Sequence, residues 1–108
     1  MIETNLTILS GTDLKVDRMT INIYDKPLCS WLDLVYENDT ITLVSVVRIN
    51  DDGDESEVHY SLSKEETKKM IDKYTLNGFV EKLRSISGIK EILDFLKKEG
   101  VLFNTKGY

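Results

Sequence analysis

The chain has 108 residues, of which 41% are hydrophobic and 31% charged, and its net charge is −5. This length is close to the commonest domain size, which predicts one domain over residues 1–108. The longest apolar run, Thr40 to Val47, is far too short to cross a bilayer, so we expect no membrane partner. A single cysteine, Cys29, and a start without a secretion-signal pattern favour the cytoplasm.

Charge is distributed unevenly along the chain. Residues 1–62 hold twelve acidic and four basic residues, a net charge of −8, whereas residues 63–108 hold ten basic and seven acidic residues, a net charge of +3. A nucleic-acid-binding protein needs a basic face, so we expect no direct contact with nucleic acid. The acidic first half is instead compatible with a basic protein partner.

The first zone alternates between apolar and polar residues with the period of a β-strand. The out-of-phase pair Leu14 and Val16 predicts a bulge or turn near Asp17. In the run from Val58 to Leu62 the alternation places His59 on the face opposite Val58 and Tyr60. The run from Ile41 to Ile49 is rich in β-branched residues and apolar on both faces, which predicts a central strand. Turn-forming residues separate the strands, which are expected at residues 5–9, 19–23, 31–36, 41–49 and 58–62.

At Ser63 the period changes to that of a helix. The run "SKEE" is a capping box, which predicts a helix from about Lys64 to Tyr74, and a second helix follows from Leu76 to Ile86. Ser87 is expected to cap a third helix that ends before Gly100. A short final strand is expected at residues 101–104. The predicted fold class is α+β: an antiparallel β-meander of four or five strands, then two or three helices packed on one face, and a short C-terminal strand.

Acidic residues are concentrated in the stretch "NDDGDESEVHY", residues 50–60. An Asp-Gly pair between two alternating apolar runs predicts a β-hairpin turn at Asp52 and Gly53. The stretch does not match a calcium-binding loop, because Arg48 and His59 would occupy its first and last positions, and we expect no metal site. A turn needs only one of the acids, so we interpret all five as candidate partner-binding residues: Asp51, Asp52, Asp54, Glu55 and Glu57.

Candidates for catalysis are few. His59 is the only histidine, and a solvated strand position explains it, while a small apolar role explains Cys29. Nucleotide-binding glycine loops and nucleophile motifs are absent from the sequence, so we expect neither an enzyme nor a cofactor. Trp31 and Asp33 share one face of a predicted strand. The first interpretation of Trp31 is core burial. The second is an interface anchor, and on that interpretation Trp31 and Asp33 are candidate partner-binding residues.

Two segments of the C-terminal half, "SLSKEETKKMI" and "IKEILDFLKKEGVLFNTKGY", carry a family resemblance. A lysine-rich closing helix, a glycine turn, a short hydrophobic strand and the terminal aromatic Tyr108 resemble small bacterial toxin-neutralising immunity proteins. The similar region covers about 45 residues. In size, acidity and α+β character the chain also resembles phage-encoded anti-CRISPR inhibitors, whose acids imitate nucleic-acid phosphates.

The sequence favours a non-enzymatic inhibitor that binds a basic protein and covers its functional site. One alternative is a phage-encoded inhibitor that mimics nucleic acid. Another is a structural or adaptor protein in which the charge serves only solubility. A small enzyme or ligand-binding protein is the remaining alternative.

Overall fold

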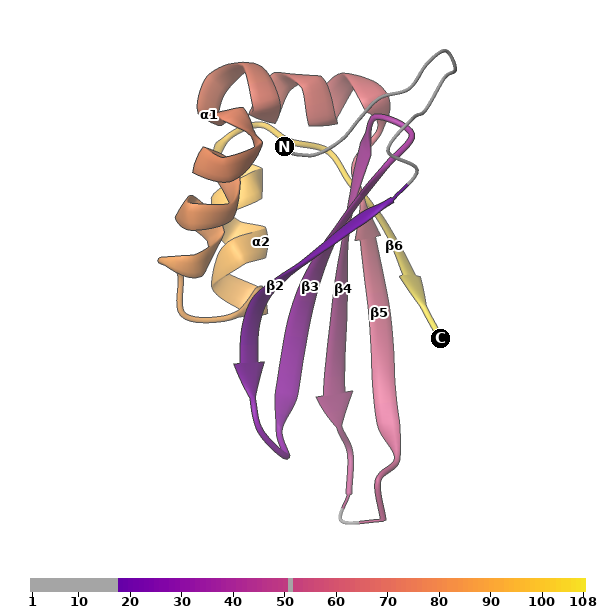
Figure 1. The fold of residues 1–108 in the computed structure, drawn as a ribbon. Helices are drawn as coiled ribbons and strands as arrows, with labels where there is room; N and C mark the ends of the chain where they lie inside the picture. Colours follow the sequence, from indigo (N-terminus) through magenta and orange to yellow (C-terminus); the bar gives the residue numbers. More distant parts are fainter. Residues whose placement is uncertain (1–17, 51) are drawn as a thin grey trace, which may run out of the picture.

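A computed structural model describes residues 18–50 and 52–108 as an antiparallel sheet with two helices (Figure 1). The sheet has the order β2-β3-β4-β5-β6. The predicted α+β meander is therefore confirmed, with β4 in the centre, while the strand expected at residues 5–9 and the bulge near Asp17 lie outside the described residues. The elements are β2 (Met19–Lys26), β3 (Ser30–Glu37), β4 (Thr40–Arg48), β5 (Glu55–Ser61), α1 (Lys64–Arg84), α2 (Ile89–Lys98) and β6 (Asn104–Gly107).

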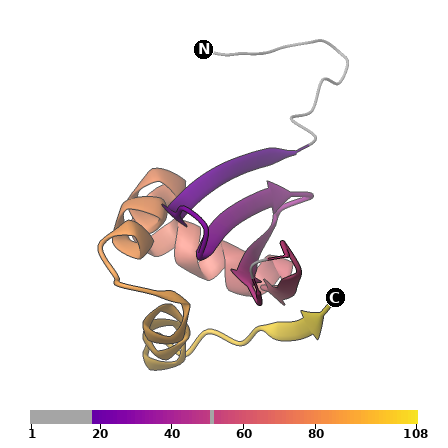
Figure 2. The same cartoon turned by 90° about the horizontal axis from the view of Figure 1, so that it is seen from below.

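Both helices lie on the same face of the sheet (Figure 2). Alternation along β3 and β4 turns every second side chain toward the helices, and most of these side chains are apolar, with the buried Ser45 as an exception. Each one that is fully buried contributes about 1.5–3 kcal/mol relative to an exposed position. The core therefore lies between the sheet and the helices, and its fully buried members include Leu32, Leu34, Ile41, Leu43, Phe79, Leu83, Ile92 and Leu96.

Helix α1 begins where the sequence predicts. The Ser63 hydroxyl accepts a hydrogen bond from the Glu66 N–H at 3.2 Å, which is the first half of the expected capping box. The Glu66 carboxylate does not supply the second half; it accepts from the Leu102 N–H at 3.1 Å and pairs with Lys69. This carboxylate therefore ties the first turn of α1 to the segment that follows α2.

A kink at Thr75 divides α1. Thr75 has φ 64° and ψ 165°, and its hydroxyl accepts from the Gly78 N–H at 3.1 Å, as a capping residue does. The predicted boundary between the first and second helices, after Tyr74, coincides with this kink. In the first half of α1 the buried Thr67 hydroxyl accepts from the Ile41 N–H at 3.0 Å, which joins the helix directly to β4.

Two predicted boundaries near the C-terminus were wrong. The N-cap of α2 is Gly88, which offers no side-chain cap, and the Ser87 carbonyl instead accepts from Lys26 Nζ at 3.3 Å. Strand β6 begins at Asn104 and not at Val101. The Val101 N–H is used to close α2, because it donates to the Leu96 carbonyl at 2.9 Å while Gly100 takes φ 74°.

Among the described residues β2 is the first strand of the sheet, and its outer edge is partly blocked. The pairing of β2 with β3 shifts between Asn22 and Tyr24, so that Ile23 forms a bulge. Beside this bulge Arg84 Nη2, at the end of α1, donates to the Asn22 carbonyl at 2.8 Å. Bulges and inward-turned cations both discourage another chain from pairing with an edge strand.

Replacement of Ser63 tests the cap. Ser63→Ala leaves the Glu66 N–H without its side-chain acceptor, and we expect a loss of about 0.5–2 kcal/mol in the free energy of unfolding. Urea unfolding followed by far-UV circular dichroism measures this loss, with the exposed Ser87→Ala, just beyond the other end of α1, as the control. Equal stability of the Ser63 variant and the wild type would contradict the cap.

Glu99 joins the end of α2 to α1. Its carboxylate accepts from Lys73 Nζ and, at 3.0 Å, from the Tyr74 hydroxyl, and these hydrogen bonds, that of Lys73 first, lower the pKa of Glu99. An acid with a lowered folded-state pKa stabilises the fold above its unfolded pKa, and this stability disappears as the pH falls through the folded-state value.

We therefore expect Glu99→Gln to lower the melting temperature at pH 7 and to have a progressively smaller effect below about pH 4.5, the ordinary value for this carboxyl. Thermal unfolding of both proteins at a series of pH values measures the difference. The exposed Asp94→Asn, on the same helix, is the control. If the melting temperatures of the wild type and Glu99→Gln differ as much at pH 3 as at pH 7, the lowered pKa of Glu99 does not explain the effect.

Candidate functional site

The sheet face that points away from the helices is the candidate site, and we call it the open face. Neither α1 nor α2 lies on it (Figure 2). Strand pairing places the alternate residues of each strand there in register. The open face consists of Thr20, Asn22, Asp25, Trp31, Asp33, Val35, Glu37, Thr40, Thr42, Val44, Val46, Arg48, Glu55, Glu57, His59, Ser61, Asn104 and Lys106.

Trp31 lies in a row that crosses four strands. It is opposite Asp25 of β2 on one side and Val46 of β4 on the other, and Val46 is in turn opposite Glu57 of β5. Trp31 is half-buried and lies outside the core cluster, so the first interpretation of Trp31 as a core residue was wrong. The apolar pair at the centre of the row thus has a carboxylate at each end.

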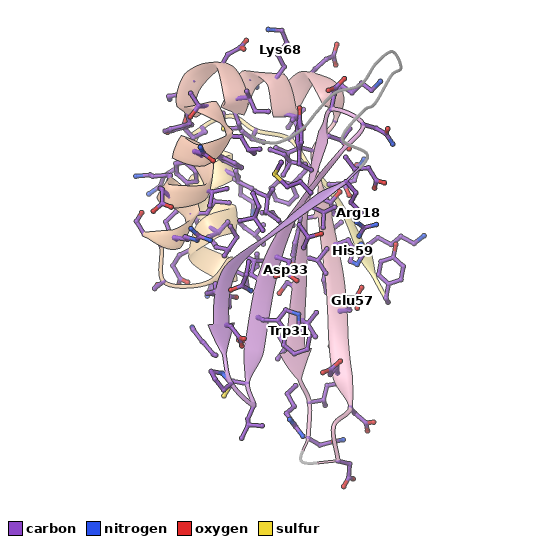
Figure 3. The ribbon with its side chains drawn as sticks, in the orientation of Figure 1. Arg18, Trp31, Asp33, Glu57, His59 and Lys68 are labelled. Carbon is purple, nitrogen blue, oxygen red and sulfur yellow. The ribbon has the colours of Figure 1, made fainter. Side chains whose placement is uncertain are left out.

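Asp33 lies in the neighbouring row. Its Oδ1 accepts from Asn22 Nδ2 at 2.9 Å, and across the sheet it is opposite Val44, which is opposite His59. The hydrogen bond fixes the orientation of the carboxylate on the open face. Figure 3 shows Trp31, Asp33, Glu57 and His59 on this side of the sheet, with Lys68 away from it on α1.

The β5 side of the open face carries a polar and aromatic group. Glu57 Oε2 and His59 Nε2 are 2.5 Å apart, and the His59 and Tyr108 ring centroids are 4.3 Å apart. Lys106 Nζ lies 5.3 Å from the Tyr108 ring centroid, and the Tyr108 N–H donates to the Glu57 carbonyl at 2.8 Å. The sequence predicted a solvated His59. In the structure these neighbours partly cover it.

The acidic stretch forms the hairpin between β4 and β5, as predicted, but Asn50 organises its turn. Asn50 Oδ1 accepts from the N–H groups of Asp52, at 2.9 Å, and Asp54, at 3.3 Å, while Asn50 Nδ2 donates to Asp54 Oδ2 at 2.8 Å. Gly53 has φ 92° and closes the turn. Asp52, Asp54 and Glu55 are exposed, and Asp51 lies outside the described residues.

The structure thus divides the predicted partner-binding residues into two groups. Trp31, Asp33 and Glu57 come together on the open face, whereas Asp52 and Asp54 lie at the hairpin tip beyond the last paired residues of β4 and β5. Glu55 connects the groups, because it begins β5 and is opposite Arg48. The sequence analysis missed Asp25, Val46 and Tyr108; their partners become visible only once the register is known.

The described part of the chain contains no cluster of three His, Cys, Asp or Glu residues able to hold a metal ion. Cys29, which the sequence explains as a small apolar residue, is exposed near the β2–β3 turn. Within residues 18–50 and 52–108 we also find no helix that is long and apolar enough to span a membrane.

Comparison of the chain with models of protein families, with curated proteins and with solved structures finds no match.

The surroundings of Trp31 lead to a solution test. Asp25, Asp33 and Glu57 lie in the row of Trp31 or the next. The quenching constant of Trp31 fluorescence, divided by that of free N-acetyltryptophanamide, should therefore be larger for caesium than for iodide at a constant, low ionic strength. Stern–Volmer titrations with both ions measure this difference. Asp33→Asn with Glu57→Gln should bring the two normalised quenching constants together, while Asp72→Asn with Glu81→Gln on α1 should leave them apart.

Proposed function

We propose that this protein is a non-enzymatic inhibitor that binds a basic protein and covers its functional site with the open face and the acidic hairpin. The observation that carries the proposal is Trp31, the only tryptophan of the chain, held between Asp25 and Val46 on a face that neither helix covers. Tryptophan is among the residues that contribute most to protein–protein binding. Carboxylates beside such an anchor select for a partner with basic side chains.

The size of the open face suits a protein partner. The four strands β2 to β5, seven to nine residues long and about 4.8 Å apart, together with the four-residue β6 cover a projected area on the order of 400–500 Å². A standard interface buries about 800 Å² on each partner. The open face together with the projecting β4–β5 hairpin reaches that scale, whereas a small-molecule site is normally concave.

The two acidic groups have different physical roles in this proposal. Asp52 and Asp54 at the exposed tip attract a basic partner from a distance and mainly raise the association rate. Asp33 and Glu57 are held in place by Asn22 and His59, so they can form oriented contacts once the surfaces meet. An inhibitor of the immunity-protein type needs both steps, because it must reach its target quickly and stay bound.

Affinity capture from the native host, with the wild type and two variants as bait, tests the proposal. Trp31→Ala removes the proposed anchor and should weaken binding of the captured protein roughly 30-fold, which corresponds to about 2 kcal/mol. Replacement of Asp52, Asp54 and Glu55 by Asn or Gln should lower the association rate on the order of tenfold at low salt and much less at physiological salt.

A matched control neutralises three exposed acids of the helix layer, Asp72, Glu81 and Asp94, and changes the net charge by the same amount. This control should associate like the wild type. The captured protein must be basic and must lose its activity when it is bound. Capture of a whole assembly that keeps its activity would support an adaptor instead, and equal binding by all variants would exclude the open face.

A further inference from the structure

A second surface lies on the helix side of the sheet, where the sheet extends beyond the helices (Figure 1). The β2–β3 turn, the end of β4 and the start of α2 surround a cleft of about 510 Å³. Leu28, Val47 and Ile49 form its apolar lining, and Ile89 contributes from α2. We call this the overhang cleft. It is separate from the open face, because Val47 points to the opposite side of β4 from Val46.

Leucine is energetically unfavourable at position 28. It is the third residue of the turn Lys26-Pro27-Leu28-Cys29, which the Cys29 N–H closes by donating to the Lys26 carbonyl at 2.9 Å. Its φ is 65°, a conformation that turns of this kind normally assign to glycine or asparagine. The side chain is also 80% exposed, so both its backbone conformation and its exposure are unfavourable in the isolated protein.

Apolar exposure is concentrated at this cleft. Val47 is 45% exposed and Ile49 62%, and together with Leu28 they account for half of the large exposed hydrophobic residues in the described part of the chain. Single exposed hydrophobic residues are normal on protein surfaces, whereas a group of them around a concavity indicates an interaction site.

Charge at the overhang cleft is opposite to that of the whole chain. The charged side chains of the cleft are Lys26 and Lys90, against a single acid, Glu91, in a chain with net charge −5. The first turn of α2 also lies at the cleft, and the positive end of its helix dipole adds to the positive potential there. The cleft is thus both apolar and locally basic.

We propose that the overhang cleft binds a short peptide segment of another protein that carries large apolar side chains beside aspartate or glutamate. Apolar side chains would fill the concavity lined by Leu28 and Ile49, and the carboxylates would contact Lys26 and Lys90. A second copy of the chain fits less well, because a symmetric contact would bring the same cations together.

Selection from a displayed library of random short peptides, with the folded wild-type chain as target, tests this proposal. Enriched peptides should combine large apolar residues with Asp or Glu. Synthetic copies should shift the amide resonances of Leu28, Ile49 and Lys90 in ¹⁵N spectra and leave the Trp31 indole N–H unmoved. Lys26→Gln with Lys90→Gln should weaken their binding at least tenfold at low salt.

Leu28→Gly and Leu28→Asn separate binding from folding. Both relieve the unfavourable backbone conformation, so the melting temperature should stay equal or rise while peptide affinity falls at least tenfold. Leu102→Ser is the matched control, because Leu102 is 74% exposed and away from the cleft, and it should bind like the wild type.

Four results would overturn the proposal: no enrichment, enrichment of basic or uncharged peptides, peptides that bind the Leu28 variants equally, or a shifted Trp31 indole signal. Binding to phosphatidylserine vesicles that depends on Leu28 would assign the cleft to a membrane instead. A dimer in sedimentation velocity that dissociates in Leu28→Gly would assign it to a second copy.

Discussion

The alternation of side chains along β3 and β4 is the constraint on which the rest of the structure depends. Each strand residue belongs to one of two faces, and a shift of register by one residue would exchange the faces completely. Leu34 lies opposite Leu43 on the helix side, and Trp31 opposite Val46 on the open side. The helices can pack because one face is predominantly apolar, and since these apolar side chains all point to that side, the other face is free to carry acids. The bulge at Ile23 lets β2 join this arrangement, since Ile23 stays buried while Asp25 remains on the open face.

The helix layer supports the open face from behind. The hydrogen bond from Ile41 to Thr67 joins β4 to α1, and Glu99 joins α2 to the same helix through Lys73. These contacts lie in and beyond the core, so changes on the open face leave them intact. A surface built on paired strands with such support can bind without rearranging, which reduces the entropic cost of association.

The elements that the sequence predicted correctly are those set by local patterns. The alternation and β-branched content of residues 41–49 identify the central strand, and Ser63 marks the start of α1 because a cap acts over three residues. The failures involve contacts distant in sequence. Nothing near Val101 indicates that its N–H closes α2 rather than starting β6, and the default of a buried tryptophan fails because only the register shows which face Trp31 occupies. The sequence predicted that the five acids of the β4–β5 hairpin form one partner-binding site. Strand pairing ends between them, however, and this separates the hairpin tip from Glu57.

The two proposed surfaces are connected most directly through β4. Val46 belongs to the open face and Val47 lines the overhang cleft, so adjacent residues of one strand reach the two sides of the sheet. The two surfaces carry charges of opposite sign: acidic residues lie near Trp31 on the open face, and lysines lie near Leu28 at the overhang cleft. Opposite potentials on opposite faces allow two different partners to approach without competing. The overhang cleft repels a basic partner, and the open face repels an acidic one. A chain with uniform negative charge could attract a basic target but could not also bind an acidic peptide. The uneven charge along the sequence, folded into this sheet, makes both kinds of contact compatible in one small protein.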